Sequence, residues 1–145
     1  MRLQPWLVYA LLSALAASFV AIFGKVGMKQ VDSNLATAVR SVVMTLFLVA
    51  VCSVMGLWSK LGTISGKAIG MIVLSGVAGA VSWLFYFRAI QLGTVSQVAP
   101  IDKLSMPLAV LLAVLLLGDR PTGWNWLGVA LIAIGGYFAA LPRPQ

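Results

Sequence analysis

Acidic and metal-binding side chains are scarce in this sequence. It has no histidine and no glutamate, and three aspartates are the only carboxylate side chains among its 145 residues. A Gly-rich phosphate loop is also missing, and no Cys, Ser or Thr stands beside a plausible base. We therefore expect no catalytic residue, no bound metal and no cofactor, and we do not expect an enzyme.

Cysteine and charged residues in general are scarce as well. Cys52 is the only cysteine and lies in an apolar run, which excludes a disulfide framework within the chain and indicates a buried structural thiol. Only 9% of the residues are charged, 61% are hydrophobic and the mean hydropathy is +1.04, whereas a soluble domain is about 25% charged. A water-soluble fold cannot cover so much apolar surface, so the lipid bilayer is the expected solvent.

Long apolar runs are what the chain has instead. A helix needs about 20 mostly apolar residues to cross a hydrocarbon core of about 30 Å. Five runs qualify, at about residues 6–28, 36–58, 68–90, 95–117 and 124–141, separated by the polar turns KQVDSN, SKLGTISGK, IQLGT and GDRPTGWN. We expect the first to be a mature helix rather than a secretory signal, because it runs on past ALAAS. The sequence thus predicts an all-α, polytopic membrane protein, with one five-helix transmembrane domain over residues 1–145 and consecutive helices antiparallel.

The positive net charge does not indicate nucleic-acid binding. The charge is +7, but the ten basic residues are scattered along the chain and form no run or stripe. Lys and Arg normally gather on the cytoplasmic side. Here four basic residues (Arg2, Lys60, Lys67 and Arg120) fall on the side of the N-terminus, and five (Lys25, Lys29, Arg40, Arg88 and Arg143) fall on the other, with Lys103 uncounted. This balance predicts that the chain inserts both ways up.

Two segments resemble a known family. The segment GTVSQVAPIDKLSMPLAVLLAVLLLGDRPTGWNWLGVALIAIGGYFAAL is similar to the last two helices of the EamA-like repeat of the drug/metabolite transporter superfamily. In that repeat a proline-containing helix ends in a Gly-acid turn, and a Gly-rich final helix follows. The segment AIFGKVGMKQVDSNLATAVRSVV is similar to an earlier part of the repeat, in which a helix ending with a lysine, a short polar turn and a helix opening with an arginine follow one another. The likeness spans nearly the whole chain.

The resemblance implies a transporter built of helix repeats, usually two five-helix repeats of opposite topology in one ten-helix chain. This sequence departs from that pattern because it has one repeat, which cannot enclose a central pathway by itself. Inverted repeats are a common transporter design, and the charge count shows no orientation bias. We therefore expect an antiparallel homodimer, with a parallel homodimer and pairing with a related chain as open alternatives.

The stretch APIDKLSMP places an acid and a base between two prolines in the fourth span. Asp102 lies about 10 Å along a helix that starts near Val95, and ionisable groups at that depth usually face a bundle interior or a watered cavity. Adjacent side chains on a regular helix diverge, so Asp102 and Lys103 would need separate partners. Pro100 and Pro107 both weaken the backbone there, as in a broken transporter helix. We expect Asp102 to couple or gate transport, and Lys103 to contact the substrate or a carbonyl freed by Pro107.

A plainer interpretation stands beside this one. If Pro100 occupies the first helical turn, the span runs from about Ile101 to Leu117, and Asp102 is an interfacial anchor near the positive helix N-terminus. We favour the site interpretation because the apolar run after the pair is by itself only just long enough to span.

Five further residues are candidates for binding the substrate. Lys25 and Arg40 flank the first turn, and they either line the pathway or extend their long side chains to the membrane interface. Trp83 and Tyr86 are three residues apart and share a helix face. That face suits either a solute-binding wall or, with Arg88 as an anchor, an interfacial aromatic belt.

Small residues recur at helical spacing, which allows close helix approach. Gly128, Gly135 and Gly136 in the last span are expected to pack against a partner subunit.

The function expected from these observations is secondary transport of a small solute across a bacterial-type inner membrane, by a multi-pass protein whose partners are the bilayer, the solute and a second copy. Basic residues near or within the membrane outnumber Asp102, which favours an anionic or zwitterionic solute. The competing class is a structural or accessory membrane subunit without transport activity, in which the charged positions serve packing and insertion. A channel is the third alternative.

Overall fold

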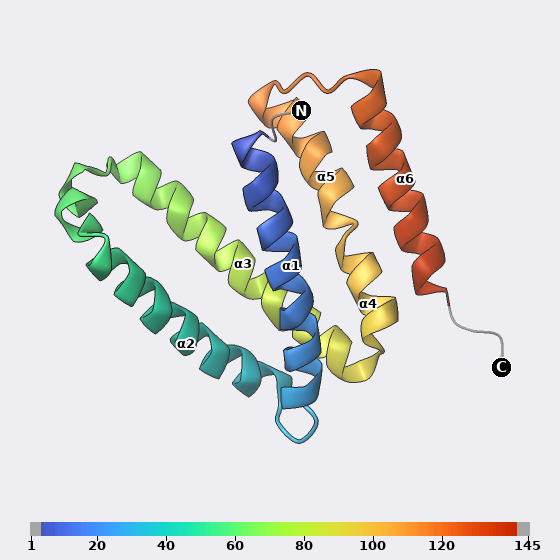
Figure 1. The fold of residues 1–145 in the computed structure, drawn as a ribbon, viewed down its shortest axis with the longest axis horizontal. Helices are drawn as coiled ribbons and strands as arrows, with labels where there is room; N and C mark the ends of the chain where they lie inside the picture. Colours follow the sequence, from blue (N-terminus) through green and yellow to red (C-terminus); the bar gives the residue numbers. More distant parts are fainter. Residues whose placement is uncertain (1–3, 142–145) are drawn as a thin grey trace. The chain divides into compact units, whose positions relative to one another are not determined.

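The computed structural model describes residues 4–141 and is all-helical (Figure 1). In chain order its elements are α1 (Pro5–Gly27), α2 (Ser33–Val54), the 3-10 segment η1 (Leu57–Thr63), α3 (Gly66–Leu92), α4 (Val95–Asp102), α5 (Ser105–Leu112), the π-helical turn η2 (Ala113–Leu117) and α6 (Gly123–Ala140). Arg2 and Arg143, which entered the charge balance, lie outside the described residues.

Five segments are long and apolar enough to cross a membrane. They are α1, α2, α3, the run Val95–Leu117 and α6. Most of their large apolar side chains are exposed, as on a protein whose surface is covered by lipid tails. The expected class, an all-α multi-pass membrane protein with five spans, is confirmed.

The ends of α2 differ from the expected range for local reasons. The helix begins at Ser33 because the Asp32 carboxylate accepts hydrogen bonds from the N–H groups of Asn34 (2.8 Å) and Leu35 (3.3 Å) and so caps it. It ends at Val54 rather than near residue 58, because the chain turns at Gly56 with a left-handed φ of 63°. The other spans begin and end within two residues of their expected ranges.

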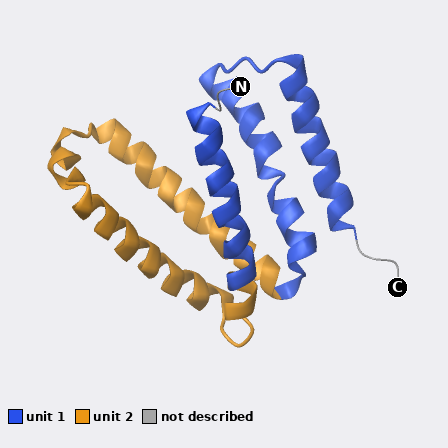
Figure 2. Ribbon diagram, viewed as in Figure 1, with its two compact units in different colours: residues 1–23, 92–145 blue, residues 24–91 orange. Residues whose placement is uncertain are grey.

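The chain forms two compact units (Figure 2). Unit 1 contains α1 up to Phe23 together with α4, α5, η2 and α6. Unit 2 contains the last turn of α1 with α2, η1 and α3 up to Gln91. In unit 1, α6 runs beside α4 and α5. In unit 2, η1 connects α2 to α3, which runs back in the opposite direction.

The tightest packing in unit 2 lies where the α1–α2 turn meets the last part of α3. Met28, Phe87 and Ile90 are buried there, with Ser33 at the start of α2. A Cβ atom on Gly24 would overlap the Phe87 ring, so this approach of α1 to α3 requires glycine.

In unit 1, α6 meets α4 at a glycine. A Cβ atom on Gly136 would lie 3.0 Å from the carbonyl oxygen of Pro100, whereas a Cβ atom on Gly135 would have nothing within 4 Å. The expectation that Gly136 packs against a partner subunit is therefore wrong. Because it lacks a side chain, α6 approaches α4 of its own chain closely.

We predict that Gly136→Val lowers the melting temperature of the purified chain by several degrees more than Gly135→Val does. Both substitutions add the same side chain to the same helix, so helix propensity cancels. Only the valine at 136 meets the Pro100 carbonyl, and overpacking of this kind costs about 1–3 kcal/mol. Thermal unfolding in detergent measures the difference, and equal melting temperatures would contradict the α4–α6 contact.

Candidate functional site

The fourth span is interrupted between α4 and α5. In a regular α-helix the N–H of Leu104 would donate to Pro100, but here it donates to the carbonyl of Ile101 at 3.0 Å. Two residues later the N–H of Met106 likewise donates to the carbonyl three positions back, that of Lys103, at 3.0 Å. These tighter bonds, each to the residue three positions back, break the register of the helix. The carbonyl of Pro100 thereby loses its regular helix donor.

The interruption lies between the two prolines. Val95 begins α4, so Pro100 lies inside the helix and not in its first turn, as the plainer interpretation required. Pro107 in α5 has no N–H to give to the Lys103 carbonyl, and the N–H of Met106 bonds to that carbonyl instead. The carbonyl freed by Pro107 therefore already accepts a backbone hydrogen bond.

Asp102 and Lys103 form an ion pair at the interruption. The Nζ atom of Lys103 donates to Oδ2 of Asp102 at 3.2 Å, with the Lys103 side chain 57% exposed and the Asp102 side chain 31% exposed. The expectation that each needs a separate partner is wrong, because the two side chains pair with each other where α4 ends. This is the only ion pair within residues 4–141.

A second group of candidates lies in unit 2 and centres on Arg40 of α2. The guanidinium carbon of Arg40 lies 3.6 Å from the ring centroid of Trp83 on α3, and 5.3 Å from the centroid of Phe87. Cation–π attraction at such distances is worth about 0.5–2 kcal/mol. Arg40 and Trp83, which were separate candidates in the sequence, therefore lie in contact in the structure.

An aromatic cluster of Trp83, Tyr86 and Phe87 supports Arg40. Trp83 meets Tyr86 edge to face with centroids 5.6 Å apart, and it packs against Phe87 at 5.4 Å. Trp83 lies nine residues before the last residue of α3, which is about 14 Å along the axis. Interfacial aromatic belts lie at the headgroup level, so this depth favours the solute-binding wall over the belt.

Lys25 caps the end of α3. Its Nζ atom donates to the carbonyl oxygen of Ile90 at 2.6 Å. Ile90 is among the last four residues of α3, whose carbonyls have no donor further along the helix. A cation at this position also meets the negative end of the helix dipole. Lys25 thus stabilises the fold, a role that the sequence pattern did not indicate.

Gln91 connects the end of α3 to the α1–α2 turn. Its Oε1 accepts from Nη1 of Arg88 at 3.0 Å, and its Nε2 donates to the carbonyl of Val31 at 3.0 Å. A cavity of about 250 Å³ lies beside it, lined by Lys25, Met28, Lys29 and Gln91. We call Lys25, Lys29 and Arg88 with Gln91 the basic corner. Sequence analysis missed Gln91 because nothing in its spacing distinguishes it from a surface glutamine.

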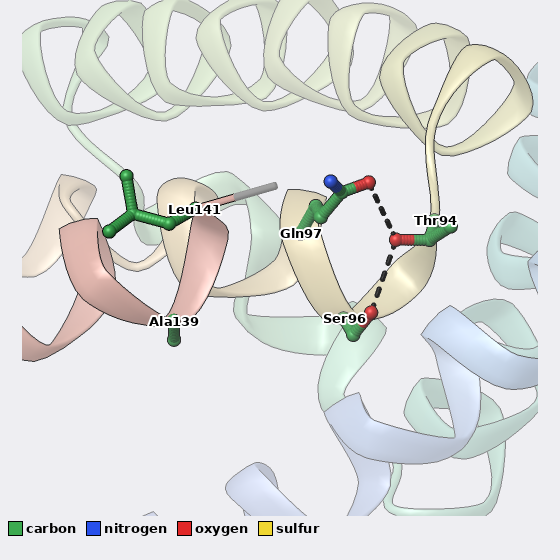
Figure 3. Close-up of a pocket in the computed structure, with 5 residues that line it drawn as sticks. All are labelled: Thr94, Ser96, Gln97, Ala139 and Leu141. Carbon is green, nitrogen blue, oxygen red and sulfur yellow. Dashed lines mark hydrogen bonds between the residues drawn. The ribbon is translucent and has the colours of Figure 1, made fainter. Parts of the chain in front are cut away.

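A polar cavity lies at the start of α4 in unit 1 (Figure 3). It has a volume of about 430 Å³, and its lining residues are Thr94, Ser96, Gln97, Ala139 and Leu141. The Thr94 hydroxyl donates to Oε1 of Gln97 at 2.8 Å and pairs with the Ser96 hydroxyl at 3.1 Å. The three polar side chains therefore bind one another, and the cavity carries no charge.

A larger cavity of about 540 Å³ lies between η2 and α6, with Asp119, Arg120 and Asn125 among its lining residues. The π-helical turn η2 ends at Gly118, whose φ is 75°. Such turns occur often at functional sites. A run of leucines gives no sign of one, so sequence reasoning missed this feature.

Comparison with known proteins relates this membrane fold to a family. Residues 4–141 match the EamA-like transporter family. A Sinorhizobium sp protein named "Uncharacterized transporter in cobO 3'region" is 44% identical over 138 residues, which make up 95% of this chain and 98% of the relative. The chain belongs to the EamA-like transporter family, and the resemblance seen in the sequence is confirmed.

A second relative is a longer protein. The riboflavin transporter of Rhizobium johnstonii is 35% identical over 74 residues, which make up 51% of this chain but only 24% of the relative. The Sinorhizobium protein, by contrast, is covered almost completely by the single repeat. No solved structure matches the chain.

We predict that Lys25→Met lowers the free energy of unfolding by about 1–3 kcal/mol, because the Ile90 carbonyl loses a charged hydrogen-bond donor. Methionine keeps most of the apolar stem, so packing changes little. Lys29→Met is the matched control in the basic corner, and its exposed side chain makes a change below about 0.5 kcal/mol the expected result. Thermal unfolding of both variants in detergent gives the comparison. Equal losses for the two variants would show that the cap contributes nothing.

Proposed function

We propose that the protein is a secondary transporter that moves a small solute across a bacterial inner membrane. The observation that carries the proposal is the interrupted fourth span with its Asp102–Lys103 ion pair. Broken helices in transporters present backbone carbonyls and charged groups where solutes and coupling ions bind. Membership of the EamA-like transporter family supports the same function.

Asp102 has the coupling role in this proposal. Within residues 4–141 it is the only carboxylate in a membrane span, since Asp32 caps α2 and Asp119 lies in the turn after η2. A proton or cation that neutralises Asp102 releases Lys103 from the ion pair. The released ammonium then binds an anionic group of the solute, so one change of partner couples the ion to the solute.

The proposed solute is anionic or zwitterionic. Lys25, Arg40, Arg88 and Lys103 lie within or at the ends of membrane spans, where Asp102 is the only carboxylate among the described residues. Surfaces with excess positive charge concentrate anions and repel cations. A lipophilic cation would meet this repulsion without a free carboxylate to offset it.

The proposed assembly is an antiparallel homodimer. One repeat supplies one wall of a pathway, and the Sinorhizobium relative has the same one-repeat extent. Inverted repeats supply two such walls in many transporters. With four basic residues on one side and five on the other, the chain has no bias that would prevent two copies from inserting in opposite orientations.

We predict that Asp102→Asn abolishes accumulation of the solute against a gradient, while exchange of labelled for unlabelled solute persists. Asparagine keeps the shape of the side chain but cannot carry the charge or the proton. A thermal-shift screen of carboxylates, amino acids and quaternary ammonium compounds identifies the solute, because a ligand of the folded state raises its stability. Uptake into liposomes containing the purified chain then measures transport, with a loss of at least about ten-fold expected.

The double variant Asp102→Asn/Lys103→Met separates coupling from structure. It removes both partners of the ion pair, so a purely structural pair predicts that the double variant recovers both stability and transport. Coupling by Asp102 predicts recovered stability without recovered accumulation. Normal transport by Asp102→Asn with unchanged pH dependence would overturn the proposed role. A wild-type chain that moves none of the screened compounds would instead favour an accessory subunit.

We predict further that both ends of the chain are found on both faces of the membrane. Labelling of single cysteines placed near each terminus, in a Cys52→Ser background, with a membrane-impermeant reagent measures this. Adding two or three lysines to one side should force a single orientation and reduce transport. A strongly one-sided result for the unmodified chain would rule out the antiparallel homodimer.

A further inference from the structure

Arg40 is a positive charge inside a membrane span that no anion neutralises within the described chain. It lies seven residues after Ser33, the first residue of α2, and therefore about 10 Å along the helix. Its contacts within residues 4–141 are with the rings of Trp83 and Phe87, and the only ion pair in that range is formed elsewhere. Attraction to aromatic rings is weaker than the cost of removing a charge from water. The site therefore has the capacity to bind an anion.

The chain's three carboxylate side chains are already in use or lie outside the spans. Asp32 accepts hydrogen bonds from the first turn of α2, and Asp102 is paired with Lys103. Asp119 lies in the turn between η2 and α6. An anion for Arg40 is therefore expected to come from a bound molecule.

The position of the guanidinium suits a carboxylate. With its central carbon 3.6 Å from the Trp83 centroid, the group rests on the face of the ring. Its N–H groups form a rigid, planar fork that matches the two oxygens of a carboxylate. Arg40 is only partly buried, so a ligand has access to it.

The surroundings of Arg40 suit a ring rather than a small hydrated ion. Trp83 and Tyr86 are partly buried, and both rings pack against the buried Phe87. A hydrated inorganic anion would lose water at this apolar wall without gaining contacts. An aromatic ring gains both buried area and offset or edge-to-face contacts with the wall.

We infer that Arg40, Trp83 and Tyr86 bind an aromatic organic anion, with Arg40 holding its carboxylate and the ring packing against Trp83 and Tyr86. This inference deepens the proposed function, and it rests on that function only in taking the bound molecule to be the transported solute. The binding site itself is tested without any transport measurement.

The test uses labelled benzoate as the probe. The purified full chain is placed in nanodiscs of neutral phosphatidylcholine, and binding is measured by scintillation proximity. Unlabelled benzamide, which has the same shape without charge, and acetate, which has the charge without the ring, compete with the probe. Benzoate is expected to compete at least about ten-fold better than either compound, because only benzoate uses both parts of the site.

Variants assign the two parts of the site. Arg40→Gln should reduce the preference for benzoate over benzamide to about one. Arg40→Lys keeps the charge but loses the planar fork, and it should retain part of the preference. Trp83→Leu should weaken benzoate binding about three- to ten-fold while the charge preference remains. Lys60→Gln in η1 removes an equal charge outside the site and should bind benzoate as the unmodified chain does. Arg40→Lys remains informative if Arg40→Gln fails to fold.

Specific outcomes overturn the inference. Equal competition by benzoate and benzamide in the unmodified chain would show that the negative charge does not contribute to binding. Equal competition by benzoate and acetate would show that the aromatic ring does not contribute. A lipid phosphate is another source of the same anionic chemistry, and loss of benzoate binding in phosphatidylglycerol nanodiscs would assign the site to lipid. Arg40-dependent benzoate binding by a chain that transports nothing would support this site and overturn the proposed function. Solute transport that Arg40→Gln leaves unchanged would support the proposed function and show that the molecule bound at Arg40 is not the transported solute.

Discussion

Backbone groups at the end of a membrane helix have no water to bind, so the protein must provide their partners. In unit 2 two charged side chains meet this demand. The carboxylate of Asp32 accepts the first N–H groups of α2, and the ammonium of Lys25 donates to the Ile90 carbonyl in the last turn of α3. The Lys25 contact, together with the hydrogen bond from Nε2 of Gln91 to the carbonyl of Val31, links the end of α1 and the α1–α2 turn to the end of α3.

The same demand explains the interruption of the fourth span. Pro107 withholds the N–H that the Lys103 carbonyl would receive, and the N–H of Met106 replaces it by bonding one residue closer. The helix α4 ends at Asp102, four residues before Met106, and at that end Nζ of Lys103 lies 3.2 Å from Oδ2 of Asp102. The ion pair therefore lies at the interruption of the fourth span.

Sequence reasoning reached the features that depend on neighbours along the chain. Apolar runs of sufficient length gave the five spans, and the spacing of Trp83 and Tyr86 placed them on one face, where their rings do meet. The prolines indicated that the fourth span is interrupted. The position of the interruption depends on which carbonyl accepts the hydrogen bond from the N–H of Leu104. The end of α2 at Val54, before the turn at Gly56, was missed because an apolar run continues past that turn.

The periodicity of apolar residues does not predict which side chains of different helices are in contact. Nothing in the sequence relates Arg40 on α2 to Trp83 on α3, or Lys25 to the carbonyl of Ile90, because these pairs form only after the turns have brought the helices together. The number and positions of the cations in a sequence do not tell which of them make hydrogen bonds that stabilise the fold. The structure distinguishes the two residues. Lys25 donates a hydrogen bond to the carbonyl of Ile90 at the end of α3, whereas the guanidinium of Arg40 lies over the ring of Trp83.

The position of Arg40 has a consequence for transport by the proposed antiparallel homodimer. In an antiparallel homodimer the two-fold axis lies in the plane of the membrane, so any residue near one face in one copy lies equally near the opposite face in the other. Arg40, about 10 Å along α2 from its start, would then occur once toward each side. Solute bound at one Arg40 and released toward the other would pass between equivalent groups, and neither direction would be favoured by the protein alone. In the proposed mechanism, direction would come from the ion that neutralises Asp102, the only carboxylate side chain in a membrane span within residues 4–141.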